Sequence, residues 1–181
     1  NRVIRNSKKY QEISLRQLVL DEYGGSPYFP QGYSLKKKTD DFIWIEYHPQ
    51  FVTQGVLVFK YPVVEGEQMM DLDSILENSK EMLQNNVPGM FENTYMTVAD
   101  VQLPSIEYKK YKGLDFAEIK GFWEVQNDFM GGPFVSHAFY SKDGKDVIVL
   151  FAFVYAPKYD KRQYLRQVES IIYSFEWAKE S

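Results

Sequence analysis

Alternating apolar and polar residues divide much of this chain into short strands. The clearest case is the segment 42–48, where Ile43, Ile45 and Tyr47 point to one face of a strand and the intervening side chains point to the other. The apolar run 55–61 predicts a second strand. Because the connection between these two segments is short, we expect them to be antiparallel neighbours.

The second half of the chain reads as a meander of four strands. They are expected at residues 105–111, 115–125, 133–141 and 146–155. Asp143-Gly144 is the strongest hairpin signal, because this dipeptide favours the tight turns that join antiparallel strands. A two-residue turn there would set Phe134 opposite Phe153 and His137 opposite Leu150. Both faces of this hairpin are mainly apolar, so we expect it to lie centrally in a sheet covered by helices.

Three segments follow the helical period. A helix over 15–23 is expected after Ser14, which forms a capping box with Gln17. A second helix starts at Asp71 or Asp73 and ends before Pro88. The last starts at Asp160 and continues to about residue 175, with an apolar stripe along one side. Short strands are expected at 33–37 and 95–98.

These elements predict one α+β domain over residues 10–181. Its antiparallel sheet would have about six to seven strands, including the C-terminal four-strand meander, and two to three helices would pack on it. Residues 1–9 are expected to be the tail of a helix or a linker from a preceding N-terminal region.

Composition and charge narrow the possible functions. With 181 residues and a net charge of -4, the chain lacks the basic surface that binding to nucleic acid requires. It has no cysteine, and no apolar run approaches the roughly 20 residues that span a bilayer. Aromatic residues make up 17% of the chain, which a strand-rich core would mostly explain; an aromatic platform for a ligand is the alternative.

Candidate catalytic residues are few. His137 is expected among apolar neighbours, and Ser136 points to the opposite sheet face, so these two cannot form a nucleophile–base pair. Glu118 and Glu124 would stand roughly 20 Å apart along one strand, too far for a two-carboxylate mechanism. A pair across strands, such as Glu118 with Glu107, stays open. The sequence predicts no catalytic, cofactor-binding or metal-binding residue.

A glycine pair at the start of a central strand is the feature that burial explains least. Two glycines beside large apolar residues permit a bulge or a close backbone approach. The loop before this strand and the loop after its neighbour should emerge at the same end of the sheet. We therefore predict a partner-binding surface there, formed by Trp123, Phe129, Met130, Gly131, Gly132, Tyr155, Lys158 and Tyr159.

Several segments carry a family resemblance: FMGGPFVS at 129–136, VYAPKYDKRQYLRQVESIIYSFEW at 154–177, and PQGYSL, DFIWI and QGVLVFKYP earlier in the chain. They resemble a Bacteroidetes lipoprotein family whose domain has no assigned function. The resemblance implies an exported precursor, held by an N-terminal lipid anchor in the cell envelope, at the periplasm or outer membrane. It supplies no catalytic residue. The element order is also similar to the Mog1/PsbP-like α+β sandwich.

The leading hypothesis is a non-catalytic envelope module that binds a protein or glycan partner, or its own N-terminal region, and no nucleic acid. The alternative is a hydrolase acting on envelope or dietary polysaccharide through paired carboxylates from Glu107, Glu118 or Glu124. A purely structural role, packing against the N-terminal region, is the third hypothesis.

Overall fold

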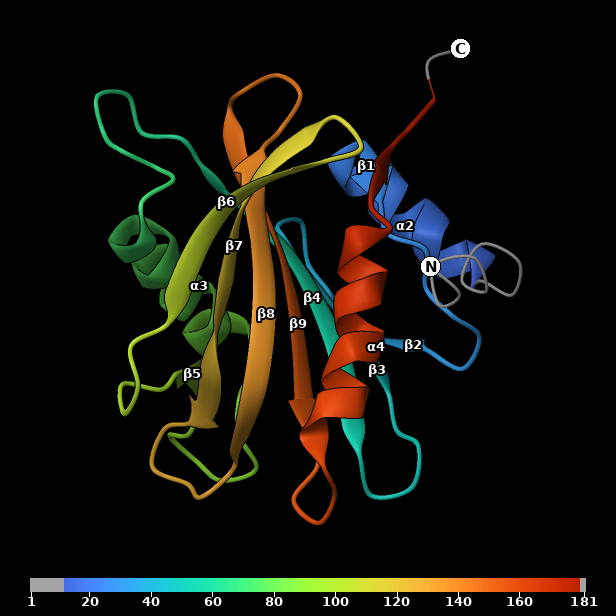
Figure 1. Ribbon diagram of the computed structural model, residues 1–181, viewed down its shortest axis with the longest axis vertical. Coiled ribbons are helices and arrows are strands. Elements are labelled where there is room, and N and C mark those ends of the chain that lie inside the picture. Colours follow the sequence, from blue (N-terminus) through green and yellow to red (C-terminus); the bar gives the residue numbers. More distant parts are fainter. Residues whose placement is uncertain (1–11, 180–181) are drawn as a thin grey trace.

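The computed structural model describes residues 12–179, in which a curved antiparallel sheet carries helices on both faces (Figure 1). Across the sheet the strands are β2 (Ser34–Lys38), β3 (Phe42–Tyr47), β4 (Thr53–Pro62), β9 (Asp146–Tyr155), β8 (Gly131–Tyr140), β7 (Leu114–Val125) and β5 (Met96–Val98). The eighth strand, β6 (Ser105–Tyr111), pairs with the first part of β7. The predicted α+β class is confirmed, with one strand more than expected in the main sheet.

The predicted register of the central hairpin is confirmed. Phe134 pairs with Phe153 and His137 with Leu150 across β8 and β9. The favoured two-residue turn for Asp-Gly has positive φ at both residues. Here only Gly144 has a positive φ, of 73°, so the turn is of a different type. The Asp143 carboxylate stabilises this turn by accepting hydrogen bonds from the Lys145 amide and the Ser141 hydroxyl.

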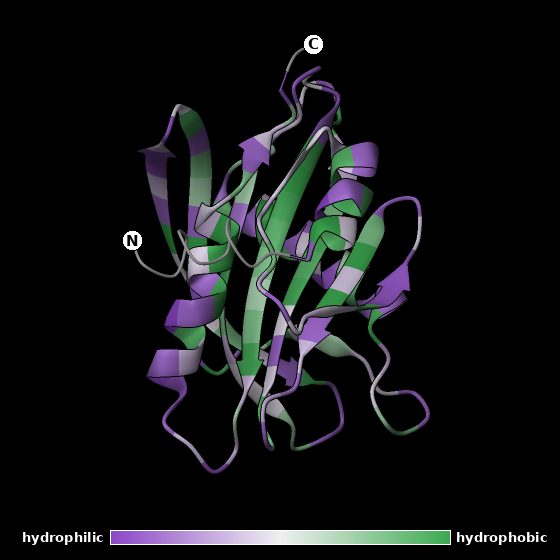
Figure 2. Ribbon diagram, turned by 90° about the vertical axis from the view of Figure 1, so that its right-hand side faces the viewer, coloured by the Kyte–Doolittle hydropathy of each residue, from purple (hydrophilic) through white to green (hydrophobic). Residues whose placement is uncertain are grey.

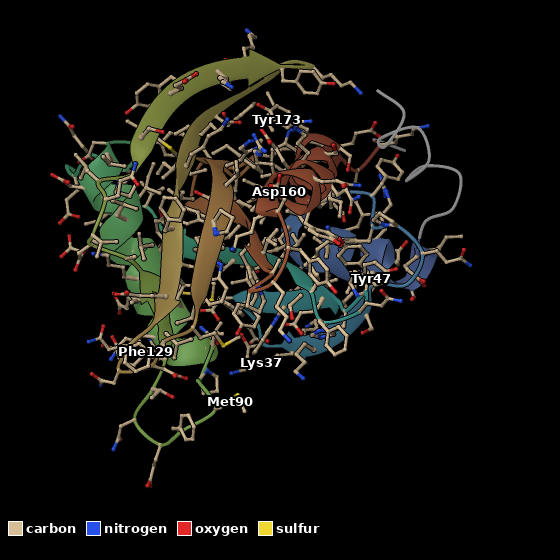
Figure 3. The ribbon with its side chains drawn as sticks, turned by 60° about the horizontal axis from the view of Figure 1, so that its bottom comes forward. Lys37, Tyr47, Met90, Phe129, Asp160 and Tyr173 are labelled. Carbon is tan, nitrogen blue, oxygen red and sulfur yellow. The ribbon has the colours of Figure 1, made fainter. Side chains whose placement is uncertain are left out.

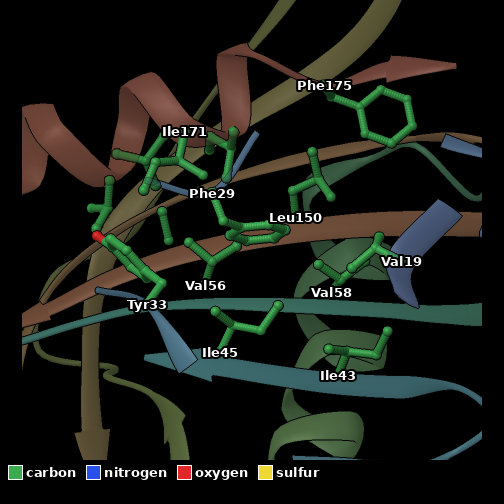
Figure 4. Packing of buried hydrophobic residues seen from close by; sticks show 14 of the residues in the cluster. Val19, Phe29, Tyr33, Ile43, Ile45, Val56, Val58, Leu150, Ile171 and Phe175 are labelled. Carbon is green, nitrogen blue, oxygen red and sulfur yellow. The ribbon is translucent and has the colours of Figure 1, made fainter. Parts of the chain in front are cut away.

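One face of the sheet is covered by α2 (Ile13–Tyr23) and α4 (Lys161–Tyr173). Figure 4 shows this packing: Ile171 of α4 and Val19 of α2 lie over the sheet residues Val56 and Leu150, with Phe29 between the layers. All five side chains are at most 1% exposed, so this face is a dry core.

The other face is covered by α3 (Leu72–Asn86). Ile75 and Leu83 of α3 pack in one buried cluster with Phe59, Phe134 and Phe151 of the sheet. Figure 2 shows the consequence: apolar residues fill the central strands, and the helices are polar on their outer sides. The expected burial of the central strands on both faces is confirmed.

The helix starts were predicted in two cases of three. Asp71 and Asp160 are the N-caps of α3 and α4, and their carboxylates accept from the Ser74 and Arg162 amides. The expected capping box at Ser14 is wrong, because α2 begins at Ile13 and its N-cap, Glu12, makes no capping bond with its side chain.

The Glu12 carboxylate accepts instead from the Gly32 amide, so it ties α2 to a loop rather than closing the helix. A short second sheet joins β1 (Gly25–Ser26) to β10 (Glu176–Trp177) and so links the chain near α2 to the C-terminal end. The expectation for residues 1–9 lies outside the described residues.

Candidate functional site

Four connections meet at one end of the sheet. They are the segments 48–52, 87–95, 126–130 and 156–160, and we call this region the loop end. The pairing places them together, since Thr53 at the start of β4 lies opposite Tyr155 at the end of β9, and Met96 at the start of β5 lies opposite Val125 at the end of β7. These loops form the lower edge of the molecule in Figure 1.

The loop end carries large apolar side chains that face solvent. Phe129 is fully exposed, at 107%, and Met90 and Phe51 are more than 80% exposed. Phe91 and Tyr159 are exposed as well. Figure 3 shows Phe129 and Met90 on this end of the molecule. Single exposed apolar residues are ordinary, but residues from four separate loops at one end form a patch of the kind that binds partners.

The loops that carry Met90 and Phe129 are held together by the backbone. The Gln126 amide donates to the Tyr95 carbonyl at 2.7 Å, and the Val125 amide donates to the Met130 carbonyl at 2.9 Å. The first bond joins the bases of the two loops, and the second closes the base of the loop that carries Phe129.

A strained turn holds Phe51 outward. In the turn 49–52, where the Val52 amide donates to the Pro49 carbonyl, Gln50 and Phe51 have φ values of 36° and 61°. Left-handed backbone costs residues other than glycine roughly 1–2 kcal/mol each. Strain of this kind is concentrated at functional sites.

The base of this turn is cross-linked by His48. Its Nε2 lies 2.7 Å from Oε2 of Glu46, and its Nδ1 lies 3.1 Å from Oγ1 of Thr53. Glu46 is buried and also accepts from the indole of Trp44 at 2.7 Å. The end of β3 and the start of β4 are thus joined by side chains below the exposed Phe51.

The predicted site residues divide into a surface set and a buried set. Phe129, Lys158 and Tyr159 are exposed at the loop end. Trp123 was expected on the surface, but it lies in the core at 3% exposure, where its indole donates to the Val154 carbonyl at 3.1 Å. The indole lies over Gly132 of β8 and packs edge-on against Phe153 and Tyr155 of β9.

Met130 and Tyr155 lie between these two sets, since both are partly buried and pack against the core under α3. Sequence reasoning missed Met90, Phe91 and Phe51. All three follow a proline by two or three residues in a loop, a signal that by itself does not indicate exposure.

The glycine pair is explained by packing within the sheet. A Cβ on Gly132 would lie 2.1 Å from the Val154 carbonyl oxygen, and one on Gly131 would lie 2.7 Å from the Trp123 carbonyl oxygen. The close backbone approach at these glycines is therefore made by neighbouring strands of the same sheet, whereas the sequence had suggested an approach by something else. The pairing of β7 with β8 is regular through both glycines, so there is no bulge at this point.

A buried polar cluster on the α4 face was not predicted. The Glu118 carboxylate accepts from His137 Nε2 at 2.9 Å, from the Tyr173 hydroxyl at 2.6 Å and from the Lys109 ammonium at 2.8 Å. Glu118 and His137 are nearly inaccessible, whereas Lys109 reaches the surface. Lys120 lies 3.8 Å from the same carboxylate.

The pKa shifts in this cluster follow from burial and hydrogen bonding. Burial alone would raise the pKa of Glu118, but hydrogen bonds from His137, Lys109 and Tyr173 outweigh it and hold this pKa well below its usual range. Burial lowers the pKa of His137, and Glu118 offsets part of that effect. Burial and the hydrogen bond to Glu118 raise the pKa of Tyr173 to about 12. The favoured state is an ionised Glu118 facing a neutral His137.

This geometry argues against the two-carboxylate mechanism. A general acid must hold a proton near neutral pH, whereas Glu118 is ionised and both of its oxygens accept hydrogen bonds from the protein. Glu107 does lie opposite Glu118, but its carboxylate is exposed and its contact at 3.8 Å is with Lys109. The cluster fits a structural role that joins β6, β7, β8 and α4.

Within residues 12–179, no group of three or more histidine, cysteine, aspartate or glutamate side chains is placed so that it could hold a metal ion. No helix in that part of the chain is long and apolar enough to cross a membrane.

The fold defines an α+β protein built on one large antiparallel sheet, with an apolar loop end. The chain belongs to the family described as Domain of unknown function (DUF4837), whose model matches residues 12–174. The predicted membership in a domain family of unknown function is thereby confirmed. The lipid anchor and the Mog1/PsbP-like likeness stay predictions.

A crystal structure from Bacteroides thetaiotaomicron VPI-5482 is similar over 87% of this chain, with 16% sequence identity and a TM-score of 0.43. The similar region covers 46% of that protein, so this chain spans less than half of its length. Among the curated proteins, none matches this sequence.

Proposed function

We propose that this chain is a non-catalytic module of the cell envelope that binds a partner protein through the loop end. The observation that carries the proposal is the set of exposed apolar side chains Phe51, Met90, Phe91 and Phe129, which come from three different loops at one end of the sheet. A fourth loop adds Tyr159.

The chemistry of these side chains favours a protein partner over a glycan. Phenylalanine and methionine have no strong hydrogen-bond donor, whereas aromatic residues and methionine are enriched in protein interfaces. Burying one such side chain contributes about 1.5–3 kcal/mol, so two or three of them could anchor a partner. The turn at Phe51 and the backbone bonds at the bases of the other two loops restrict the backbone of these loops before binding, which lowers the entropic cost of association.

The resemblance to a Bacteroidetes lipoprotein family supports placing the module in the cell envelope. A lipid anchor before the N-terminal region would hold the domain near a membrane, and the loop end would remain available to a protein in the same compartment.

The test is site-specific photo-crosslinking in the native envelope, with the full-length precursor carrying p-benzoyl-phenylalanine in place of Phe51 or Phe129. The control places the same photo-reactive residue at Ile13, which is 72% exposed on α2 and belongs to none of the four segments of the loop end. We expect both loop-end positions to give adducts with the same protein and the Ile13 position to give none of it.

Three results would overturn this proposal. One is the absence of adducts at Phe51 and Phe129 beyond those at Ile13. Another is an adduct whose added mass is removed by digestion of polysaccharide, which would identify a glycan. The third is crosslinking confined to the chain's own N-terminal region, which would make the loop end an intramolecular packing surface.

A further inference from the structure

A cleft opens at the end of the sheet opposite the loop end. The ladder between β7 and β8 ends at the pair Ala117–Ala138, although β7 begins at Leu114 and β8 continues to Tyr140. Beyond that pair the two strands separate, and Figure 1 shows the tip of the β6–β7 hairpin crossing over β8. The space between them is a cleft of about 430 Å³, within the range of about 300–1,000 Å³ that is typical of small-ligand sites.

Two exposed tyrosines are among the residues that line this cleft. Tyr108 from β6 and Tyr140 from β8 line it, and both rings are exposed to solvent. The Tyr108 hydroxyl donates to the Met70 carbonyl at 2.7 Å, so this wall is held in place by the segment before α3. The alanines Ala117 and Ala138 form part of the floor, and their small side chains leave room between the rings.

Charged groups of both signs also line the cleft. Lys110 and Asp115 lie opposite each other in the pairing of β6 with β7, and both are lining residues. Tyr61 lies on the same face of the sheet: it pairs with Val147 of β9, which in turn pairs with Tyr140 of β8. Its hydroxyl is buried and makes no hydrogen bond with the residues of 12–179.

The exposed aromatic residues differ between the two ends of the molecule. Phe51, Phe91 and Phe129 are exposed at the loop end together with Tyr159, whereas the exposed aromatic residues that line the cleft are the tyrosines Tyr108 and Tyr140. A tyrosine ring offers an apolar face together with a hydroxyl group, which suits a ligand that is itself apolar on one side and polar at its edges. This difference predicts two different kinds of partner.

We propose that this cleft binds a sugar ring of a glycan. The C–H face of a pyranose ring would stack on Tyr140 or Tyr108, and its hydroxyls would hydrogen-bond with Lys110 and Asp115. A third charged lining residue, Lys109, is paired with the Glu118 carboxylate at 2.8 Å, which leaves Lys110 and Asp115 with no net charge between them. That balance suits a neutral polyol better than an ion. The site is separate from the loop end, so the proposal does not depend on the protein partner.

Methyl groups in the cleft make the proposal directly measurable. With ¹³C-methyl-labelled alanine and methionine, the signals of Ala117, Ala138 and Met70 report on the cleft, and the signal of Met90 reports on the loop end. The probes are cellobiose, maltose and N,N′-diacetylchitobiose, titrated one at a time. We expect at least one disaccharide to shift the cleft signals in a saturable manner and to leave Met90 unchanged.

Three variants then locate the contact. Tyr140→Ala should weaken binding at least tenfold, whereas Tyr159→Ala should leave it unchanged, although the two tyrosines are similarly exposed at 46% and 43%. Lys110→Ala should also weaken binding, by loss of a hydroxyl partner. Unchanged signals from the buried Ala152 would show that each variant is folded.

The proposal would be overturned if none of the three disaccharides shifted the cleft signals. It would also be overturned if Tyr140→Ala bound as tightly as the wild type. A further contrary result would be saturable shifts with p-cresol and none with the saccharides, because the cleft would then be a site for an apolar ligand.

Discussion

Replacing Glu118 with alanine removes the acceptor for three donors at the centre of the α4 face. The His137 N–H is buried and would lose its partner, at a cost of about 1–3 kcal/mol. The Tyr173 hydroxyl would lose a bond worth about 0.5–1.5 kcal/mol. Lys109 can turn into water, since 35% of its side chain is exposed, and adds little. Together these losses predict that Glu118→Ala lowers the free energy of unfolding by about 1.5–4.5 kcal/mol.

Urea unfolding at about pH 7.5 measures this difference. With a slope of about 2 kcal/mol/M, in the middle of the usual range, the midpoint should move down by about 1–2 M. The matched control is Glu107→Ala, a carboxylate on the neighbouring strand that is 70% exposed and contacts the same lysine. The control should change the free energy of unfolding by less than about 0.5 kcal/mol. If Glu118→Ala cost no more than Glu107→Ala, the reasoning about the buried cluster would be refuted.

The remaining predictions concern acid, close packing and helix capping. Folding lowers the pKa of both His137 and Glu118, so the unfolded chain binds more protons than the folded protein at acidic pH. The free energy of unfolding should therefore fall as the pH drops below 6.5, the ordinary pKa of histidine, and fall further below 4.5, the ordinary pKa of glutamate. Urea unfolding from about pH 8 to 4 checks this, and a flat profile would contradict it. Gly132→Ala should lower the free energy of unfolding, measured by thermal unfolding, by about 1–3 kcal/mol, because the added Cβ would clash with backbone atoms. Gly121→Ala should lower it by less, because its Cβ would meet only side chains, at 3.0–3.2 Å. Asp71→Ala should lower stability by about 1 kcal/mol through loss of the α3 cap, and an unchanged melting temperature would exclude that role.

The central hairpin was predictable because its signals are local. Asp143-Gly144 marks the turn, and the alternation on either side then leaves one register between β8 and β9. Asp71 and Asp160 were predictable as caps for the same reason. The cap of α2 was not, because Glu12 bonds to Gly32, which is distant in the sequence, and Ser14 therefore lies inside the helix.

The Glu118 cluster could not be predicted because it depends on long-range pairing. The segment 126–130 between β7 and β8 has no tight-turn signal, so the pairing of Glu118 with His137 was not fixed by local residues. Tyr173 comes from α4, 55 residues further along the chain. Burial of Trp123 was missed similarly, because the Val154 carbonyl that binds its indole belongs to β9, beyond the neighbouring strand β8.

The cleft exists because β7 and β8 separate beyond Ala117 and Ala138, and the pattern of hydrophobic residues along the sequence does not predict where two strands separate. The alternation in β7 and β8 continues past Ala117 and Ala138, so the sequence indicates a longer ladder than the structure has.

The central claim is that the exposed apolar side chains of the loop end bind a protein. The most direct test is the affinity of the crosslinked partner, once purified, for the wild type, for the double variant Phe51→Ser/Phe129→Ser and for the control Ile13→Ser. Two lost phenylalanine anchors at about 1.5–3 kcal/mol each predict at least about 100-fold weaker binding for the double variant. All three proteins should unfold at similar urea concentrations, because the replaced side chains are exposed. A double variant that bound within about threefold of the wild type would contradict the account.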